Sequence, residues 1–159
     1  NTLSEAVGLI AFDRRARGVD IQYEPPWSLP ATYALRGQLQ QVFINLFLNA
    51  LDAMPHGGRL SIRVRKKLRE IIVEVEDTGC GITPELGRRV FEPFLTTKEP
   101  GMGAGLGLEV SYSIIQKHGG SLDFSSTVGK GTVFTVQIPI LDQAPKETWN
   151  GSSNRTTGR

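Results

Sequence analysis

The segment 38–54 constrains the fold more than any other part of the chain, because its apolar side chains repeat with the period of a helix. Apolar residues recur at spacings of three and four, which places them on one face: Leu39, Val42, Phe43, Leu46, Phe47, Ala50, Leu51 and Met54. Gly57 and Gly58 follow and predict the end of the helix. A helix with one continuous apolar face packs on a second layer of structure, so the sequence predicts a layered domain.

Strands supply the second layer. They are predicted where apolar and polar residues alternate, or where short apolar runs lie between turns: residues 19–24, 60–64, 71–75, 122–124 and 132–138. Further helices are predicted over residues 3–16, 83–91 and 108–117. Because some strands follow one another directly while others are separated by helices, we expect an α+β fold with a mixed sheet and helices on one face.

The polar face of the 38–54 helix is unusual in its composition. Amides and one carboxylate, rather than the usual Lys and Glu, stack at spacings of three and four: Gln38, Gln41, Asn45, Asn49 and Asp52. A carboxamide offers a carbonyl oxygen without a charge, which suits Mg²⁺ that is already held by phosphate oxygens. The alternative is that a neighbouring element half-covers this face and the amides satisfy its backbone.

A second motif, residues 76–82, follows the strand predicted over 71–75. Asp77 shares the parity of Ile71, Val73 and Val75, so its carboxylate should point to the buried side, where it needs a hydrogen-bond donor. The exocyclic amine of a purine could supply that donor, and the glycines on either side of Cys80 would let the backbone approach a flat ring. The alternative is an aspartate that caps its own turn.

The third motif is the glycine-rich run from Lys98 to Leu108, which leads into a predicted helix. Successive glycines free backbone N–H groups to hold phosphates, and the N-terminus of the following helix favours negative charge. The run is not a P-loop, because no Gly-Lys-Ser/Thr follows it. The alternative is a flexible linker.

Gly129-Lys130-Gly131-Thr132 forms a fourth motif, at the start of the last predicted strand. Thr132 shares parity with Phe134, Val136 and Ile138, so its hydroxyl should face inward, and a buried hydroxyl needs a partner. Asp77 or a ligand could be that partner. The alternative is an ordinary hairpin turn that leads into a β-branched strand residue.

Composition fits one globular domain, predicted here over residues 1–141. The formal net charge of +2 arises from 18 basic and 16 acidic residues, which gives no reason to expect a nucleic-acid partner. The single cysteine, Cys80, cannot form an internal disulfide, and no apolar run approaches the ~20 residues that span a bilayer, so we expect a cytoplasmic domain. Residues 142–159 lack an apolar pattern and predict a disordered tail. Because the chain starts at Asn1 without Met, we expect it to be part of a longer bacterial sensor, and the sequence leaves open whether that parent is membrane-bound.

Together the motifs resemble the ATP-binding (Bergerat) fold shared by histidine kinases, gyrase, MutL and the ninety-kilodalton heat-shock chaperone. The resemblance covers roughly residues 3–140. It is carried by four consecutive sequence boxes, followed by Gly-x-Gly-Thr at 129–132: the N box at 45–53, the G1 box at 77–82, the F box at 91–98 and the G2 box at 103–108. Four boxes in this order are far more specific than any one of them.

The resemblance implies a two-layer α/β sandwich in which ATP lies between the sheet's helices under a mobile lid, formed by residues 98–103. It implies that Asn49 coordinates Mg²⁺, that Asp77 bonds the adenine amino group, and that Thr132 supports Asp77 through a water. Lys98 would lie near the outer phosphates, and Asn45 and Lys98 are the catalytic candidates. The implied nucleotide-binding residues are Asn45, Asn49, Asp52, Ala53, Asp77, Gly79, Gly81, Ile82, Lys98, Gly103, Gly105, Leu106, Gly107, Leu108 and Thr132.

Two features favour the histidine kinase branch of this superfamily. The ATPase branches carry a Glu one helical turn before the metal asparagine, whereas this chain has Asn45 there, and an amide cannot act as a general base near neutral pH. The F box, which the ATPase branches lack, is also present. We therefore expect weak hydrolysis of Mg-ATP and transfer of its γ-phosphoryl group to a histidine.

The accepting histidine should belong to a separate dimerisation domain of the same parent protein, with a response regulator downstream. His56 lies in a turn and His118 ends a helix, so neither is expected to accept phosphate. Without the dimerisation helices, this chain is expected to be a monomer. Two other functions remain open: a nucleotide-responsive binding module without catalysis, and an ATPase or serine kinase of the same fold.

Overall fold

A single mixed sheet organises the computed structural model, which describes residues 2–92 and 107–142. The strands are β1 (Val19–Tyr23), β2 (Gly58–Lys67), β3 (Glu70–Asp77), β4 (Ser121–Thr127) and β5 (Gly131–Pro139). Their order across the five-stranded sheet is β1-β2-β3-β5-β4. β1 pairs with β2 in parallel, and the other pairs are antiparallel, so the predicted mixed sheet is confirmed.

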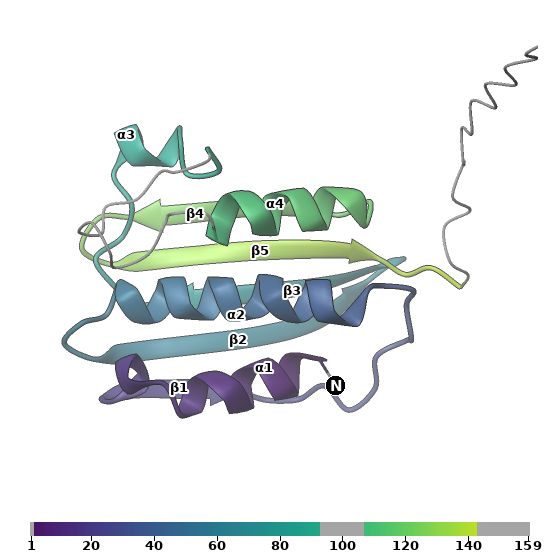
Figure 1. Cartoon of the computed structure of the whole chain (residues 1–159), viewed down its shortest axis with the longest axis horizontal. Coiled ribbons are helices and arrows are strands. Elements are labelled where there is room, and N and C mark those ends of the chain that lie inside the picture. The colour runs from purple at the N-terminus through teal and green to yellow at the C-terminus, as the bar shows by residue number, and fades with distance from the viewer. Residues whose placement is uncertain (1, 93–106, 143–159) are drawn as a thin grey trace, which may run out of the picture.

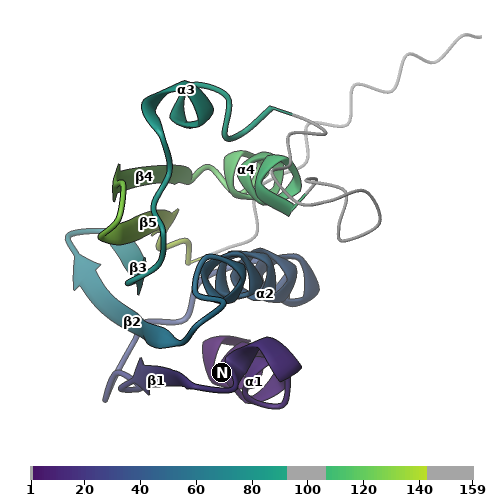
Figure 2. The same cartoon turned by 90° about the vertical axis from the view of Figure 1, so that its left-hand side faces the viewer.

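The long helices form a second layer on one face of this sheet. They are α1 (Thr2–Ala11), α2 (Arg36–Asp52) and α4 (Gly107–Lys117), with a 3₁₀ turn at Arg14–Ala16 and a short α3 (Pro84–Gly87). Figure 2 shows α1, α2 and α4 side by side along the sheet, with α2 between the other two. The predicted two-layer α+β fold is therefore confirmed.

The core lies between these layers and is centred on α2. All eight apolar residues predicted for its inner face are buried, among them Val42, Leu46 and Phe47 with no exposed surface. The sheet contributes the inward residues of its central strands, including Leu60, Val73 and Val136. Burying these side chains accounts for most of the driving force that holds α2 on the sheet.

Two predicted helices are shorter than their apolar patterns indicated. The first ends at Ala11 rather than at residue 16, because Asp13 starts a separate 3₁₀ turn by accepting the N–H of Arg15 at 2.9 Å. The second spans only Pro84–Gly87 rather than 83–91. Conversely, β4 and β5 are longer than predicted, because cross-strand pairing extends them to the hairpin between Thr127 and Gly131.

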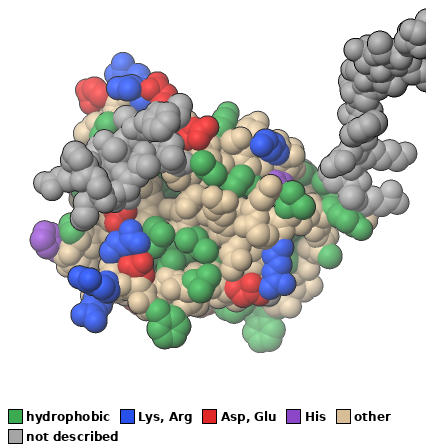
Figure 3. All heavy atoms as spheres, viewed as in Figure 1, with side chains coloured by type: hydrophobic (Ala, Val, Ile, Leu, Met, Phe, Trp, Pro, Cys, Tyr) green, Lys and Arg blue, Asp and Glu red, His purple; other side chains and the backbone are tan. Residues whose placement is uncertain are grey.

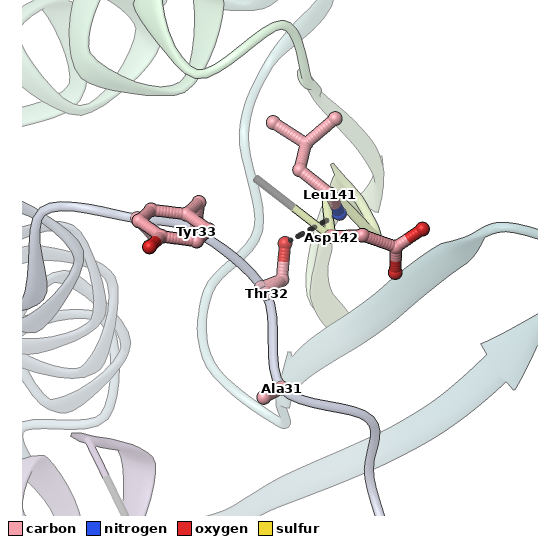
Figure 4. Close-up of a pocket in the computed structure, with 6 residues that line it drawn as sticks. Ala31, Thr32, Tyr33, Leu141 and Asp142 are labelled. Carbon is pink, nitrogen blue, oxygen red and sulfur yellow. Dashed lines mark hydrogen bonds between the residues drawn. The ribbon is translucent and has the colours of Figure 1, made fainter. Parts of the chain in front are cut away.

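A shallow hollow lies where the loop before α2 meets the end of β5 (Figure 4). The Thr32 hydroxyl donates to the Pro139 carbonyl at 2.8 Å and accepts the Leu141 N–H at 3.0 Å. His118 ties down the same loop, since its Nε2 accepts the N–H of Leu35 at 3.1 Å. These contacts give His118 a structural role, and they lie at the opposite end of the sheet from Asp77.

Candidate functional site

α2 and β3 end at the same edge of the molecule (Figure 1, left), and the described residues of the N box and the G1 box lie at these two ends or beside them. Asp77 is the last residue of β3 and pairs across the sheet with Thr132 of β5. Ala53 follows the last residue of α2, and its carbonyl accepts the N–H of Cys80 at 3.0 Å. This bond joins the end of the helix to the loop after Asp77, so the N-box and G1-box segments lie together.

Asp77 is the only acidic residue among the buried side chains of the described chain, with 5% of its surface exposed. Its Oδ1 accepts the N–H of Gly79 at 2.8 Å. Desolvation raises the pKa of the carboxyl, against the lowering effect of the backbone N–H groups of Gly79 and Thr132, and nearby Glu76 raises it slightly further. A carboxylate held in this way is a strong acceptor that carries a large desolvation cost.

This raised pKa predicts how stability depends on pH. The folded chain binds the Asp77 proton more tightly than the unfolded chain, so the free energy of unfolding falls as pH rises from the ordinary range of a carboxyl through the raised pKa. Asp77→Asn cannot ionise, and we expect it to gain stability relative to the parent over that window and to keep the gain at higher pH. Urea denaturation at a series of pH values measures this difference, and parallel curves for the two proteins would count against it.

Close backbone approach explains the glycine at position 79. A Cβ there would lie 2.5 Å from the Ala53 carbonyl oxygen and 2.8 Å from Asp77 Oδ1, which no real side chain tolerates. The missing side chain therefore lets the loop lie against the end of α2. Gly81 and Ile82, two further predicted contacts, continue this loop toward the hairpin that joins β4 and β5, where Cys80 O accepts the N–H of Gly129 at 2.8 Å.

Thr132 is buried as predicted, but the partner of its hydroxyl differs from our expectation. We expected Asp77 or a ligand; instead Thr132 Oγ1 lies 2.8 Å from the Oγ of Ser126 on β4. Ser126 Oγ also accepts the N–H of Ile82 at 2.8 Å. The reason is strand pairing, since the register opposes Ser126 to Thr132. A water between Thr132 and Asp77 stays a prediction.

Asn45 and Asn49 lie one helical turn apart, and both are partly buried. The amide of Asn45 donates to the Gly107 carbonyl and to Ser111 Oγ, each at 3.3 Å, and therefore links α2 to the first turn of α4. At Asn45, this contact agrees with the alternative interpretation of the polar helix face, in which a neighbouring element covers the face and the amides satisfy its backbone. Gly107 and Leu108 open α4, as the G2-box prediction requires.

Asp52 forms an ion pair with Arg15 of the 3₁₀ turn, at 3.2 Å. The same guanidinium contacts Asp13 at 2.9 Å. Asp52 therefore lies at the edge of the predicted site, beside a cation that the sequence motifs did not indicate. Its contact with a nucleotide stays a prediction.

An aromatic cluster fixes the first residue of the F box. Phe91 stacks on Tyr112 of α4, with ring centroids 4.9 Å apart, and meets Phe124 of β4 edge-on at 6.0 Å. Lys98, Gly103, Gly105 and Leu106, together with the proposed lid, lie outside the described residues, as does the predicted tail after residue 142.

The sequence motifs missed three residues of the site: Ser126, Ser111 and Arg15. Ser126 shares parity with Leu122 and Phe124, so a longer predicted β4 would have placed its hydroxyl on the inner side. The burial of Ser111 on α4 and the contact between Arg15 and Asp52 depend on packing between distant segments, for which the sequence gives no signal.

Where the described residues form the surface over the helices, charge is not concentrated in one patch. Figure 3 shows basic side chains in separate groups on this face, with acidic side chains close to several of them. Within the described ranges, no helix has the length and apolar character needed to cross a membrane.

Comparison with known proteins places these features in a family. Residues 34–142 match the model of the "Histidine kinase-, DNA gyrase B-, and HSP90-like ATPase" family. Sensor kinase CckA of Brucella abortus is 45% identical over 120 residues, which are 66% of this chain and 13% of CckA. The chain spans between 13 and 30% of the length of the first three relatives.

Two solved structures have the same architecture. The catalytic domain of histidine kinase ThkA aligns with a TM-score of 0.77 and 31% identity, over 88% of this chain and 91% of ThkA's. Full-length ShkA in complex with AMPPNP aligns with a TM-score of 0.74 and 28% identity, over 91% of this chain and 30% of ShkA's.

Proposed function

This chain belongs to the histidine kinase-, DNA gyrase B- and HSP90-like ATPase family, and from that premise we propose that it is the catalytic module of a sensor histidine kinase. In this proposal it binds Mg-ATP and directs the γ-phosphoryl group to a histidine on a separate helical domain of its parent protein. The match to the family model and the similarity to its relatives establish the family. The choice of ligand rests on the residues of the site.

The single observation that carries the proposal is the buried carboxylate of Asp77. A charge with 5% exposure is costly unless donors satisfy it, and one of its oxygens already accepts the N–H of Gly79. A purine amine at the other oxygen would provide a further donor. The absence of a side chain at Gly79 lets this loop lie against the end of α2, with the N–H of Gly79 on Asp77 Oδ1.

The other predicted residues would contact the phosphate end of such a ligand. Asn49 offers a neutral carbonyl oxygen, the kind of ligand that suits Mg²⁺ when phosphates provide the negative charge. No group of three His, Cys, Asp or Glu side chains forms a metal site within the described ranges, so Mg²⁺ would depend on Asn49 and the phosphates. The start of α4 at Gly107 would present backbone N–H groups to the phosphates. Lys98, Gly103, Gly105 and Leu106 remain predicted contacts.

Bound Mg-ATP would supply the phosphoryl group, and the chain would contribute position and electrostatic stabilisation. Asn45 occupies the position where a general base for hydrolysis would stand, and its amide is engaged with Gly107 and Ser111. An amide does not accept a proton from water near neutral pH, so water would not be activated there. The site would therefore hold ATP for an external histidine. The same proposal includes a response regulator downstream and a cytoplasmic location.

A phosphotransfer assay tests this function. The chain is incubated with γ-labelled ATP, Mg²⁺ and the helical domain of the same parent protein, and we expect label on a histidine of that domain. The matched control replaces the helical-domain histidine with Gln and should remain unlabelled. ATP binding without any labelled histidine would reject phosphoryl transfer and leave a binding module.

A further inference from the structure

The imidazole of His118 joins α2 to α4 at the end of the sheet opposite Asp77. His118 follows the last residue of α4, and its Nε2 accepts the N–H of Leu35, the residue before α2, at 3.1 Å. Its other ring nitrogen, Nδ1, lies 2.8 Å from the carbonyl oxygen of Ile114, one helical turn back on α4. One ring therefore bonds backbone groups at the start of α2 and at the end of α4, which lie side by side in Figure 2.

These two partners fix the position of the hydrogen on the neutral ring. A backbone N–H can only donate, and a carbonyl can only accept. Nε2 must therefore lack a hydrogen, and Nδ1 must carry the one hydrogen and donate it to Ile114. The opposite tautomer would set donor against donor at Leu35 and acceptor against acceptor at Ile114.

The start of α2 depends on this ring for one of its N–H groups. Leu35 occupies the N-cap position of α2, and its side chain makes no capping hydrogen bond. The first N–H groups of a helix have no acceptor within the helix. His118 supplies that acceptor for Leu35 from the neighbouring helix.

Protonation of the ring would break one of its two bonds and strengthen the other. Histidine is the side chain that gains a proton between about pH 5 and 8. A hydrogen on Nε2 would face the N–H of Leu35, and the new positive charge would lie at the N-terminus of α2, which favours negative charge. The same charge is favoured at the C-terminus of α4, where Nδ1 would still donate to Ile114. A protonated ring would therefore stay on α4 and lose Leu35.

The charged groups around His118 leave this choice to the ring itself. The titratable and charged side chains on the segments that meet here are Tyr33, Arg36, Lys117 and Asp142. Arg36 pairs with Glu5, and Asp142 pairs with Arg69 at 3.7 Å. Arginine, lysine and aspartate keep their charges, and tyrosine stays neutral, in the range where histidine gains its proton. Over that range they form a constant background, and the change in charge occurs on the imidazole.

We propose that His118 is a pH-sensitive switch that binds the start of α2 to the end of α4 while its ring is neutral and releases Leu35 when its ring is protonated. The release is local, because Thr32 holds the same loop through Pro139 and Leu141 with groups that do not titrate (Figure 4). The switch does not depend on the proposed function, since it lies at the other end of the sheet.

NMR spectra of the ¹⁵N-labelled chain, recorded between about pH 5 and 8, test this switch. At the upper end we expect the hydrogen of the His118 ring on Nδ1, and as pH falls we expect the Leu35 amide resonance to move with the same midpoint as the ring. The protection of the Leu35 amide against hydrogen exchange, corrected for the intrinsic effect of pH, should fall by roughly three- to tenfold, the worth of about one hydrogen bond. The amide of Leu141, which donates to Thr32, should keep its protection.

Two substitutions assign the response to this ring. His56 is the other histidine of the chain, so His56→Gln is the matched control and should leave the response of Leu35 unchanged. His118→Gln provides an oxygen that can accept the N–H of Leu35 but cannot titrate, and we expect it to keep the protection of Leu35 and to abolish its dependence on pH.

Three results would overturn the switch: a hydrogen on Nε2 of the neutral His118 ring, a Leu35 amide that does not follow the titration of that ring, or a pH response of Leu35 that persists in His118→Gln. If His118→Gln does not fold, the first two measurements on the parent chain still decide the question, because neither needs a variant.

Discussion

Asp77→Asn is expected to lower the affinity for ATP more than tenfold, a loss of at least ~1.4 kcal/mol. The substitution keeps the shape of the side chain but replaces one acceptor with an NH₂ donor. Because the N–H of Gly79 donates to Oδ1, the amide should turn its oxygen toward Gly79 and its NH₂ toward the ligand. A donor would then face the adenine amine, and a buried polar group that lacks its partner is costly. Calorimetry with a non-hydrolysable ATP analogue measures the effect.

Glu76→Gln is the matched control for this experiment. Glu76 is adjacent to Asp77 but, by strand alternation, faces the other side of the sheet, where it pairs with Arg63 at 2.6 Å. The Glu76→Gln substitution removes one carboxylate charge without changing the side chains on the inner face of the sheet. An equal loss in both variants would indicate a general effect of charge, and unchanged affinity in Asp77→Asn would remove Asp77 from the base site.

Gly131→Ala is expected to destabilise the fold by about 4 kcal/mol, from backbone strain and overpacking together. Gly131 has φ +135°, a conformation that side chains rarely adopt. A Cβ at this position would also overlap the backbone carbonyl of Asp77, and neither strand can move without breaking the pairing that buries Thr132. Urea denaturation of the nucleotide-free chain measures the change in the free energy of unfolding.

Gly129→Ala separates the two causes. Gly129 also has a positive φ, +78°, but a Cβ there would meet nothing within 4 Å. Only the conformational cost of about 1 kcal/mol should appear. Equal losses at the two glycines would show that the close approach to Asp77 has no energetic weight.

The alternation of residue types predicted the fold and the central site residue because both depend on local periodicity. The helical repeat along 38–54 correctly indicated every buried side chain of α2. The parity of Asp77 with Ile71, Val73 and Val75 correctly placed its carboxylate on the buried side. In each case, the residues of one short segment are enough to predict which side chains are buried.

Contacts between segments could not be predicted in the same way. The bond from Ser126 to Thr132 depends on the register of β4 against β5, and the bond from Arg15 to Asp52 joins residues 37 positions apart. For the same reason, the sequence could not decide whether the amides on the polar face of α2 bind a ligand or a neighbouring element. Asn45 turned out to bond the backbone of α4, and only the packing of the two helices decides this. Periodicity identifies which face is buried but not which neighbour covers it.

We propose that a nucleotide binds where β3 and α2 end. Titration of the ¹⁵N-labelled chain with Mg²⁺ and a non-hydrolysable ATP analogue tests this claim. We predict that amide resonances of Gly79, Gly107 and Thr132 shift with saturation, while those of Thr32 and Leu141 at the opposite hollow stay in place. Shifts confined to that hollow, or no shifts at Gly79 and Thr132, would contradict the claim.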